Sequence, residues 1–154
     1  MSVDVGQPAP AFTMPTDGGG TVSLSDLAGK IVVLYFYPKD DTSGCTAEAC
    51  DFRDNLAQFN SVGAVVIGVS KDSVASHDKF KKKHGLTFTL ASDAEGETCE
   101  RYGTWVQKSM YGRTYMGIDR ATFLIDGTGT VRQIWRKVKV PGHVAAVKKA
   151  IDAL

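Results

Sequence analysis

Residues 31–50 of this chain read IVVLYFYPKDDTSGCTAEAC. The first seven are apolar and rich in β-branched and aromatic side chains, which is typical of a central strand buried on both faces. A polar loop follows. From Cys45 onward, apolar residues recur at the spacing of one helical face, at Cys45, Ala49, Phe52, Leu56 and Phe59. The stretch therefore predicts a buried strand, a turn, and a helix with Cys45 in its first turn.

The rest of the chain alternates strand and helix patterns around this unit. Further strands are predicted at residues 12–14, 21–24, 64–70, 88–90, 121–126 and 130–135. Helices are predicted at residues 73–83, 96–102 and 144–154, with a short helical turn at 25–29. This order indicates a parallel sheet core with helices on both faces, to which the last hairpin adds antiparallel strands. We expect an α/β fold in a single domain, residues 1–154, with a central mixed β-sheet flanked by helices and an N-terminal β-hairpin.

Composition is that of an ordinary globular protein and excludes several functions. The 154 residues are 43% hydrophobic and 23% charged, with a formal net charge of +1. Nucleic-acid binding is not expected, because it depends on strongly basic surfaces. No apolar run reaches the roughly 18–20 residues that span a bilayer, and the N-terminus does not resemble a secretory signal. Three cysteines fit redox thiols in a reducing compartment, so we expect a cytoplasmic protein with no membrane partner.

Cys45 is the first candidate for chemistry. Backbone N–H groups in the first helical turn have no intrahelical partner, and the helix dipole favours an anion there. A thiol in that position loses its proton readily, and the thiolate is the reactive form. The alternative is a buried cysteine that acts only as a small apolar residue. A metal site is not expected, because the scattered His77, His84 and His143 look like surface or capping residues.

The spacing of Cys45 and Cys50 has a mechanical consequence. Residues five apart in an α-helix are offset by about 140° and about 7.5 Å along the axis. Their Cα atoms are then more than about 8 Å apart, whereas a disulfide requires roughly 4.4–6.8 Å. If both cysteines are helical, a disulfide between them therefore requires the first turns of the helix to unwind.

Four segments, in order, carry a family resemblance. Residues 38–45 have the arrangement P-x-x-x-T-x-x-C, which looks like the peroxiredoxin active-site signature. Residues 45–50 resemble the bacterioferritin comigratory protein type, also called peroxiredoxin Q. Residues 6–12 look like the opening of that family, residues 120–126 like its active-site arginine segment, and residues 137–143 like its closing signature. The resemblance runs over nearly the whole chain.

The resemblance implies a thioredoxin-like fold and assigns roles to five residues. Cys45 would be the peroxidatic cysteine, and Cys50 the resolving cysteine. Thr42 would hydrogen-bond the thiolate or the peroxide. Arg120 would hold the thiolate and polarise the peroxide, because donors aimed at the charge that develops on the leaving oxygen lower the barrier. Pro38 would shield the site from water. The usual family loop has proline at the position of Ser43, a departure that should loosen the loop slightly.

The family also implies partners and a reaction. Peroxides are the expected substrates, and a thioredoxin-like dithiol the expected reductant. No cofactor or metal is expected, and since this family type is often monomeric, a monomer is expected. Peroxide would oxidise Cys45 to a sulfenic acid, which Cys50 would convert to an intramolecular disulfide. Two alternatives use the same cysteine pair: a redox sensor that signals through helix unwinding, and a general thiol–disulfide exchange module, which the missing C-x-x-C motif disfavours.

Five other residues carry open expectations. Glu48 either pairs with a cation beside Cys45 or serves only as a capping or surface residue, because an unpaired carboxylate would oppose thiolate formation. Cys99 is expected to be a partly buried bystander, with a backup resolving thiol as the alternative. Tyr111 and Tyr115, with Trp105, are expected either to pack in the core or in loops, or to line an apolar approach for organic hydroperoxides.

Overall fold

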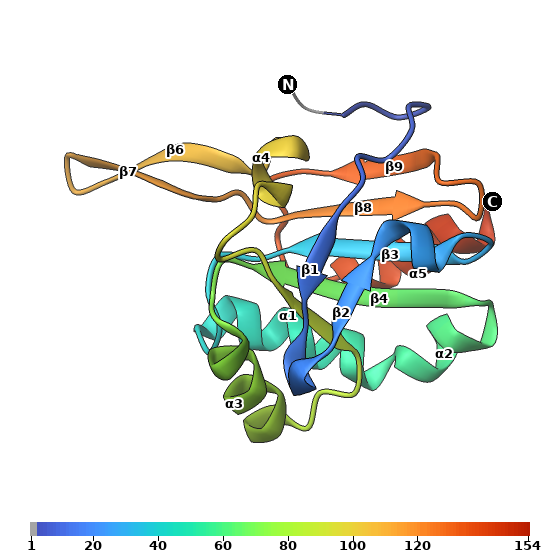
Figure 1. The fold of residues 1–154 in the computed structure, drawn as a ribbon, viewed down its shortest axis with the longest axis horizontal. Helices are drawn as coiled ribbons and strands as arrows, with labels where there is room; N and C mark the ends of the chain where they lie inside the picture. Colours follow the sequence, from blue (N-terminus) through green and yellow to red (C-terminus); the bar gives the residue numbers. More distant parts are fainter. Residues whose placement is uncertain (1–2) are drawn as a thin grey trace.

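A computed structural model describes residues 3–154 and shows a central five-stranded mixed sheet (Figure 1). The strands lie in the order β5-β4-β3-β8-β9. Their bounds are Ile31–Phe36 for β3, Ala64–Ser70 for β4, Thr89–Ser92 for β5, Ala121–Ile125 for β8 and Val131–Trp135 for β9. Strands β3, β4 and β5 pair in parallel, whereas β8 pairs antiparallel with both β3 and β9. The predicted α/β fold with a mixed sheet is confirmed.

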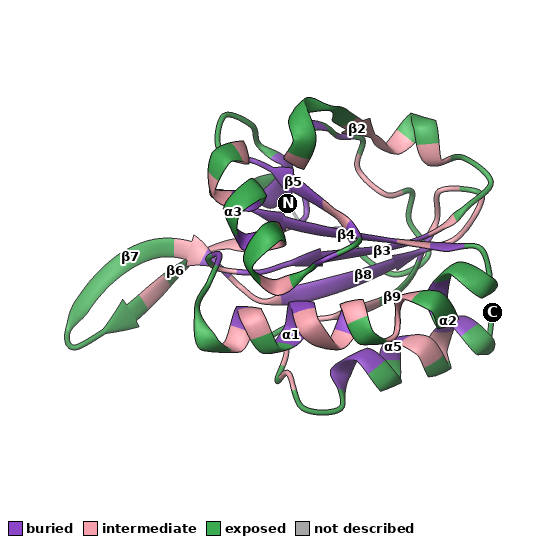
Figure 2. Cartoon of the chain, turned by 90° about the horizontal axis from the view of Figure 1, so that it is seen from below, coloured by how far each residue is buried: buried purple, intermediate pink, exposed green. Residues whose placement is uncertain are grey.

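Two apolar cores lie on opposite faces of this sheet. Successive residues of β3 alternate between them, with Val33 and Tyr35 in the first core and Leu34 and Phe36 in the second. The helices are α1 (Ser43–Asp54), α2 (Leu56–Ser61), α3 (Val74–His84), α4 (Thr98–Arg101) and α5 (His143–Asp152). Figure 2 shows α1, α2 and α5 along one side of the sheet, where they cover the first core. Helix α4 and the N-terminal segment cover the second core, and α3 packs beside β5.

The N-terminal hairpin is present as predicted. Strands β1 (Thr13–Pro15) and β2 (Thr21–Ser23) pair antiparallel around a short 3-10 turn, η1 (Asp17–Gly19). A second 3-10 turn, η2 (Leu24–Leu27), lies close to the helical turn predicted at residues 25–29. Within residues 3–154, none of the helices has the length and apolar character needed to cross a membrane.

The predicted helix after the polar loop is present, but it is split into α1 and α2. Asn55 separates them with φ −110° and ψ 7°, and its side-chain amide donates to the carbonyl of Asp51 at 2.8 Å. Four of the five residues of the predicted apolar face are buried in the first core, and the fifth, Leu56, is partly exposed. The face read from the sequence is therefore the face that packs on the sheet.

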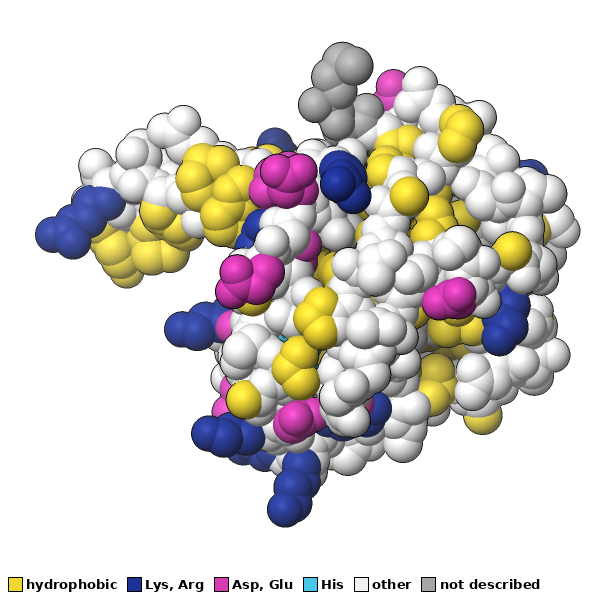
Figure 3. All heavy atoms as spheres, in the orientation of Figure 1, with side chains coloured by type: hydrophobic (Ala, Val, Ile, Leu, Met, Phe, Trp, Pro, Cys, Tyr) yellow, Lys and Arg dark blue, Asp and Glu magenta, His cyan; other side chains and the backbone are white. Residues whose placement is uncertain are grey.

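Residues 105–118 form a hairpin that the sequence pattern did not predict. Strands β6 (Trp105–Met110) and β7 (Arg113–Ile118) pair antiparallel around Tyr111 and Gly112, whose φ angles are 53° and 75°. The hairpin projects from the body (Figure 1), and Figure 3 shows apolar side chains along it. Tyr111 is 96% exposed, so the expectation of core packing is wrong for this residue. Because little of the hairpin is buried, its sequence lacks the period-two alternation that marks a half-buried strand.

Candidate active site

Cys45 lies where β3 ends and α1 begins. Thr42 is the residue before the first turn of α1, and its backbone is extended with φ −85° and ψ 156°. Cys45 is the third residue of the helix and is only 2% exposed. The thiol is therefore placed in the first helical turn, as the sequence predicted, and is largely shielded from solvent.

Arg120 reaches this thiol because of the register between β3 and β8. Phe36, the last residue of β3, lies opposite Ala121, the first residue of β8. Arg120, which precedes Ala121, therefore lies at the same end of these strands as the loop that leads to Cys45. Its Nη2 donates to Sγ of Cys45 at 3.3 Å, and its Nη1 donates to Oε1 of Glu48 at 2.7 Å. Burial alone would lower the pKa of Arg120, but Glu48 and Cys45 outweigh it, so the pKa is raised and the side chain stays cationic.

Glu48 is fully buried one turn after Cys45. Its Oε1 pairs with Arg120, whereas its Oε2 has no hydrogen-bond partner among residues 3–154. Burial raises the pKa of Glu48 to about 7, because the attraction of Arg120 offsets only part of the desolvation. The pairing with a cation is the alternative that the structure supports, and a surface role is excluded.

Thr42 and Pro38 lie on the loop that leads to Cys45. The hydroxyl of Thr42 donates to the carbonyl of Lys39 at 3.0 Å, and the carbonyl of Thr42 accepts from the N–H of Thr46 at 2.8 Å. Since its single hydroxyl proton is used within the loop, the oxygen of Thr42 is left to accept hydrogen bonds. Pro38 is partly buried at the start of the same loop.

The other two cysteines occupy different environments. Cys50 is on α1 with Cys45 and is partly exposed, and all three cysteines are free thiols. Both members of the predicted pair are therefore helical, the condition under which a disulfide requires unwinding. Cys99 belongs to the second core, across the sheet from Cys45, and burial together with Asp93 raises its pKa well above the ordinary value. This placement fits the bystander expectation, except that Cys99 is fully buried.

The histidines correct one expectation from the sequence. His77 and His143 are buried, so neither is a surface residue, whereas His84 is partly exposed and contacts Asp41 at 3.0 Å. The Nε2 of His143 lies 2.8 Å from Oγ1 of Thr122. Burial and, to a smaller extent, the charge of Arg120 lower the pKa of His143 to about 4.

His77 belongs to a polar network behind the loop that the sequence did not reveal. Its Nδ1 lies 2.7 Å from Oδ2 of Asp40, and the backbone N–H of Asp40 donates to Asp72 at 2.7 Å. These three residues bring metal-ligand atoms within 4.8 Å of one another, but the groups are already hydrogen-bonded within the protein. The available signal was two adjacent acids, Asp40 and Asp41, in a loop between a buried strand and a helix.

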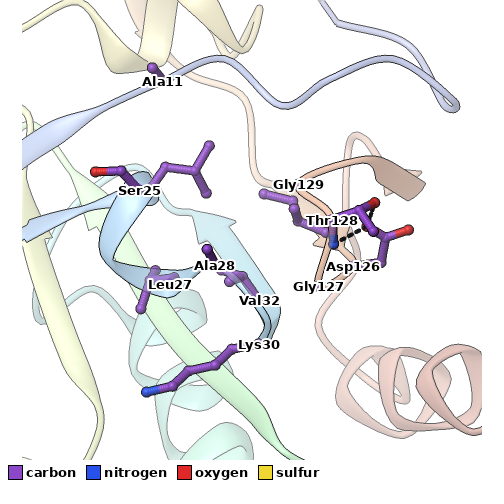
Figure 4. A pocket seen from close by; sticks show the side chains of 12 residues that line it. Ala11, Ser25, Leu27, Ala28, Lys30, Val32, Asp126, Gly127, Thr128 and Gly129 are labelled. Atoms are coloured by element: carbon purple, nitrogen blue, oxygen red, sulfur yellow. Dashed lines mark hydrogen bonds between the residues drawn. The ribbon is translucent and has the colours of Figure 1, made fainter.

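A cavity at the opposite end of β3 is separate from this site. Its volume is about 290 Å³, and its lining includes Leu24, Leu27, Lys30 and Val32 (Figure 4). Lys30 directly precedes β3 and Val32 is its second residue, whereas Cys45 follows the other end of that strand. None of the three cysteines is among the residues that line the cavity.

Comparisons with known proteins identify the family to which this chain belongs. A family model described as the AhpC/TSA family matches residues 5–134. The chain is 58% identical to a putative peroxiredoxin Bcp of Coxiella burnetii over 147 residues, which cover 96% of this chain and 97% of that protein. It is 53% identical to peroxiredoxin Bcp of Bacillus subtilis over 145 residues, covering 94% and 92% of the two chains.

Solved structures of similar proteins point to the same family. A bacterioferritin comigratory protein of Xanthomonas campestris, whose structures concern its alkyl peroxide reduction activity, matches with a TM-score of 0.88 and 45% identity. The match covers 92% of this chain and 90% of that one. A PrxQ variant from Xylella fastidiosa matches with a TM-score of 0.94 and 39% identity, over 99% of this chain and 98% of that one.

Proposed function

The chain belongs to the AhpC/TSA family and is a thiol peroxidase of the peroxiredoxin Bcp or PrxQ type, with a thioredoxin-like fold, and from this premise we propose the roles of its residues. Cys45 is the thiolate that attacks the peroxide. A sulfur–oxygen bond forms as the O–O bond breaks, and Cys45 becomes a sulfenic acid. The other oxygen leaves with the bond's electron pair and takes up a proton, giving water or an alcohol.

The contact of Arg120 with Cys45 is the observation that carries this proposal. A guanidinium 3.3 Å from Sγ stabilises the thiolate electrostatically and has further N–H groups to direct at the developing charge on the peroxide. Cys45 also lies in the first turn of α1, whose free N–H groups add positive potential. Both effects act in a site that is largely shielded from water, where electrostatic interactions are stronger.

Thr42 and Pro38 complete the proposed site. The oxygen of Thr42 accepts the O–H of the peroxide, because its own proton is donated to Lys39. That hydrogen bond orients the O–O bond for attack by the thiolate. Pro38 covers the loop and limits the access of water to the reacting atoms.

Cys50 is the proposed resolving residue. Its thiol condenses with the sulfenic acid of Cys45, an S–S bond forms, and water leaves. Because both residues lie on α1, the helix unwinds in its first turns before the sulfur atoms can meet. An external dithiol, thioredoxin-like by family, then reduces the disulfide. We place this cycle in the cytoplasm, with hydrogen peroxide and organic hydroperoxides as substrates and the enzyme acting as a monomer.

Peroxide consumption with a dithiol donor tests the proposal. Cys45→Ser should abolish turnover, whereas Cys99→Ser should leave it near the wild-type rate. Mass spectrometry of the peroxide-treated wild type should locate one disulfide, between Cys45 and Cys50. Turnover that survives Cys45→Ser would refute the assignment of the attacking thiol. A disulfide that forms without sustained turnover would favour a redox sensor.

A further inference from the structure

His77 occupies an unusual position behind the active-site loop. It is on α3, its side chain is fully buried, and both ring nitrogens lie within hydrogen-bond distance of an oxygen. Nε2 is 3.0 Å from the carbonyl oxygen of Ala91, and Nδ1 is 2.7 Å from Oδ2 of Asp40. A carbonyl oxygen can only accept a hydrogen bond, so Nε2 carries a proton.

The partners of Asp40 determine the proton on the other nitrogen. The hydroxyl of Tyr37 donates to Oδ1 of Asp40 at 2.5 Å, and the hydroxyl of Ser76 donates to Oδ2 at 2.8 Å. Donors that converge on both oxygens favour the ionised carboxylate, so Nδ1 of His77 donates as well and the ring is an imidazolium. Burial acts to lower the pKa of His77, but Asp40, with smaller help from Ala91 and Asp72, outweighs it, and the pKa is raised.

We propose that His77 is a positioning residue for the peroxidase reaction, and that its imidazolium, through Asp40, holds the loop that carries Pro38 and Thr42 to Cys45. This inference rests on the proposed roles of those three residues. Among the described residues, the polar partners of His77 are Tyr37, Asp40 and Ala91, whereas those of Arg120 are Glu48 and Cys45, so His77 acts through the loop.

Other polar contacts also hold this loop. The N–H of Asp40 donates to Asp72, and the exposed carboxylate of Asp41 pairs with Lys83 at 2.7 Å. Exposed pairs of that kind contribute little to stability, because water and salt screen them. Asp41 also has a φ of 60°, a left-handed conformation that aspartate adopts more readily than most residues. The buried carboxylate of Asp40, which accepts from Ser76 and His77, is therefore the main attachment of the loop to α3, and His77 is its charged partner there.

Deprotonation of His77 would loosen this contact. The Nδ1 lone pair of a neutral ring would face the Asp40 carboxylate, while Nε2 kept its bond to Ala91. Three groups face the ring and set its charge. Asp40 lies on the loop, Tyr37 directly follows β3, and Asp72 lies in the turn before α3. A displacement of about 1 Å in groups that position a substrate can cost up to about a hundredfold in rate.

The charge state of His77 is tested directly by nitrogen-15 NMR of the imidazole rings. At neutral pH, His77 should show both ring nitrogens protonated. His143, which is buried with a lowered pKa, should show a neutral ring and serves as the internal reference. A neutral His77 ring at neutral pH would overturn the proposal.

The kinetic test uses His77→Gln and Asp40→Asn in the full-length protein. The second-order rate constant for oxidation of Cys45 by hydrogen peroxide is measured from about pH 6 to about pH 9, across the range where histidine titrates. In the wild type the constant should fall on the alkaline side as His77 loses its proton. His77→Gln should lower it about tenfold near neutral pH and remove the alkaline fall. The double variant should be no slower than the slower single variant.

A matched control separates positioning from stability. Phe80→Leu, one turn further along α3, weakens the packing of the same helix, including the packing of the Phe80 ring near Tyr37, but replaces no hydrogen-bonding group of the Asp40–His77 pair. It should keep the wild-type pH profile. If His77→Gln lowers the rate constant by the same factor at every pH, His77 has a packing role only, and the proposal is contradicted. If Cys45→Ser abolishes turnover while His77→Gln matches the wild type, this inference fails and the proposed function stands.

Discussion

The guanidinium of Arg120 lies against the sulfur of Cys45, with Nη2 3.3 Å from Sγ, although the two residues are 75 positions apart in the sequence. The same side chain donates to Glu48, so one cation connects the Cys45 thiol to a buried carboxylate one helical turn away. A thiolate at Cys45 therefore competes with Glu48 for the same positive charge. The proton affinity of Glu48 and the orientation of Arg120 both bear on the reactivity of the sulfur.

Arg120→Lys should greatly reduce activity although it keeps the charge. A lysine ammonium lacks the planar fork that contacts Cys45 and Glu48 together. We expect the rate constant for Cys45 oxidation to fall by about a hundredfold or more, in line with the loss of a donor to developing negative charge. Arg132→Lys, at an exposed pair with Asp126, is the control. A rate near that of the wild type would show that charge alone is sufficient.

Gly44→Ala should reduce activity without reducing stability. A Cβ at Gly44 would lie 3.2 Å from Nη2 of Arg120, closer than ordinary van der Waals contact, so the guanidinium must shift. Alanine is also the better helix former, by up to about 1 kcal/mol. Stopped-flow oxidation should therefore slow several-fold, while the urea midpoint stays the same or rises. Ser43→Ala, at the exposed preceding position, should change neither quantity appreciably.

Cys50→Ser should consume about one equivalent of peroxide per chain and then stall. The sulfenic acid on Cys45 would persist, because the thiol proposed to resolve it is absent. Trapping with dimedone and mass spectrometry should locate the adduct on Cys45, and a small external thiol should restore slow turnover. Continued turnover without such a thiol, or a disulfide from Cys45 to Cys99, would contradict the role given to Cys50.

Glu48→Gln should change how stability depends on pH. The pKa of Glu48 is about 7 in the folded protein, against an ordinary value of 4.5, so the unfolded chain releases this proton first as pH rises. Ionisation therefore favours the unfolded state between about pH 4.5 and pH 7, and the effect is constant above that range.

Urea unfolding in the Cys45→Ser background isolates this effect, because the Cys45 thiol no longer titrates. The free energy of unfolding with Glu48 present, relative to Glu48→Gln, should fall from pH 4.5 to pH 7. The exposed Glu95→Gln is the control for the substitution itself. A difference between Glu48 and its glutamine variant that does not change with pH would show that the carboxyl group does not titrate in this range.

Much of the fold follows from local patterns. The apolar run from residue 31 and the run 64–70 correspond to β3 and β4, and the helical spacing from Cys45 onward identifies the face of α1 that packs on the sheet. These signals are readable because one strand or helix repeats its contacts every two, three or four residues. The β6–β7 hairpin was missed because little of it is buried, so its sequence has no such repeat.

The sequence by itself identified Cys45 as the candidate for the attacking thiol, placed it in the first turn of a helix, showed a second thiol five residues on, and indicated the family. The resemblance implied that Arg120 holds Cys45, but only the tertiary structure gave the geometry of this contact. It also decided that Glu48 is buried beside it and that His77 lies behind the loop rather than on the surface. The physical reason is the distance along the chain between the residues that determine each feature. Helix starts and thiol spacing depend on neighbours along the chain, whereas these contacts depend on the pairing of β3 with β8 and on the packing of α3 beside β5, which no local pattern records.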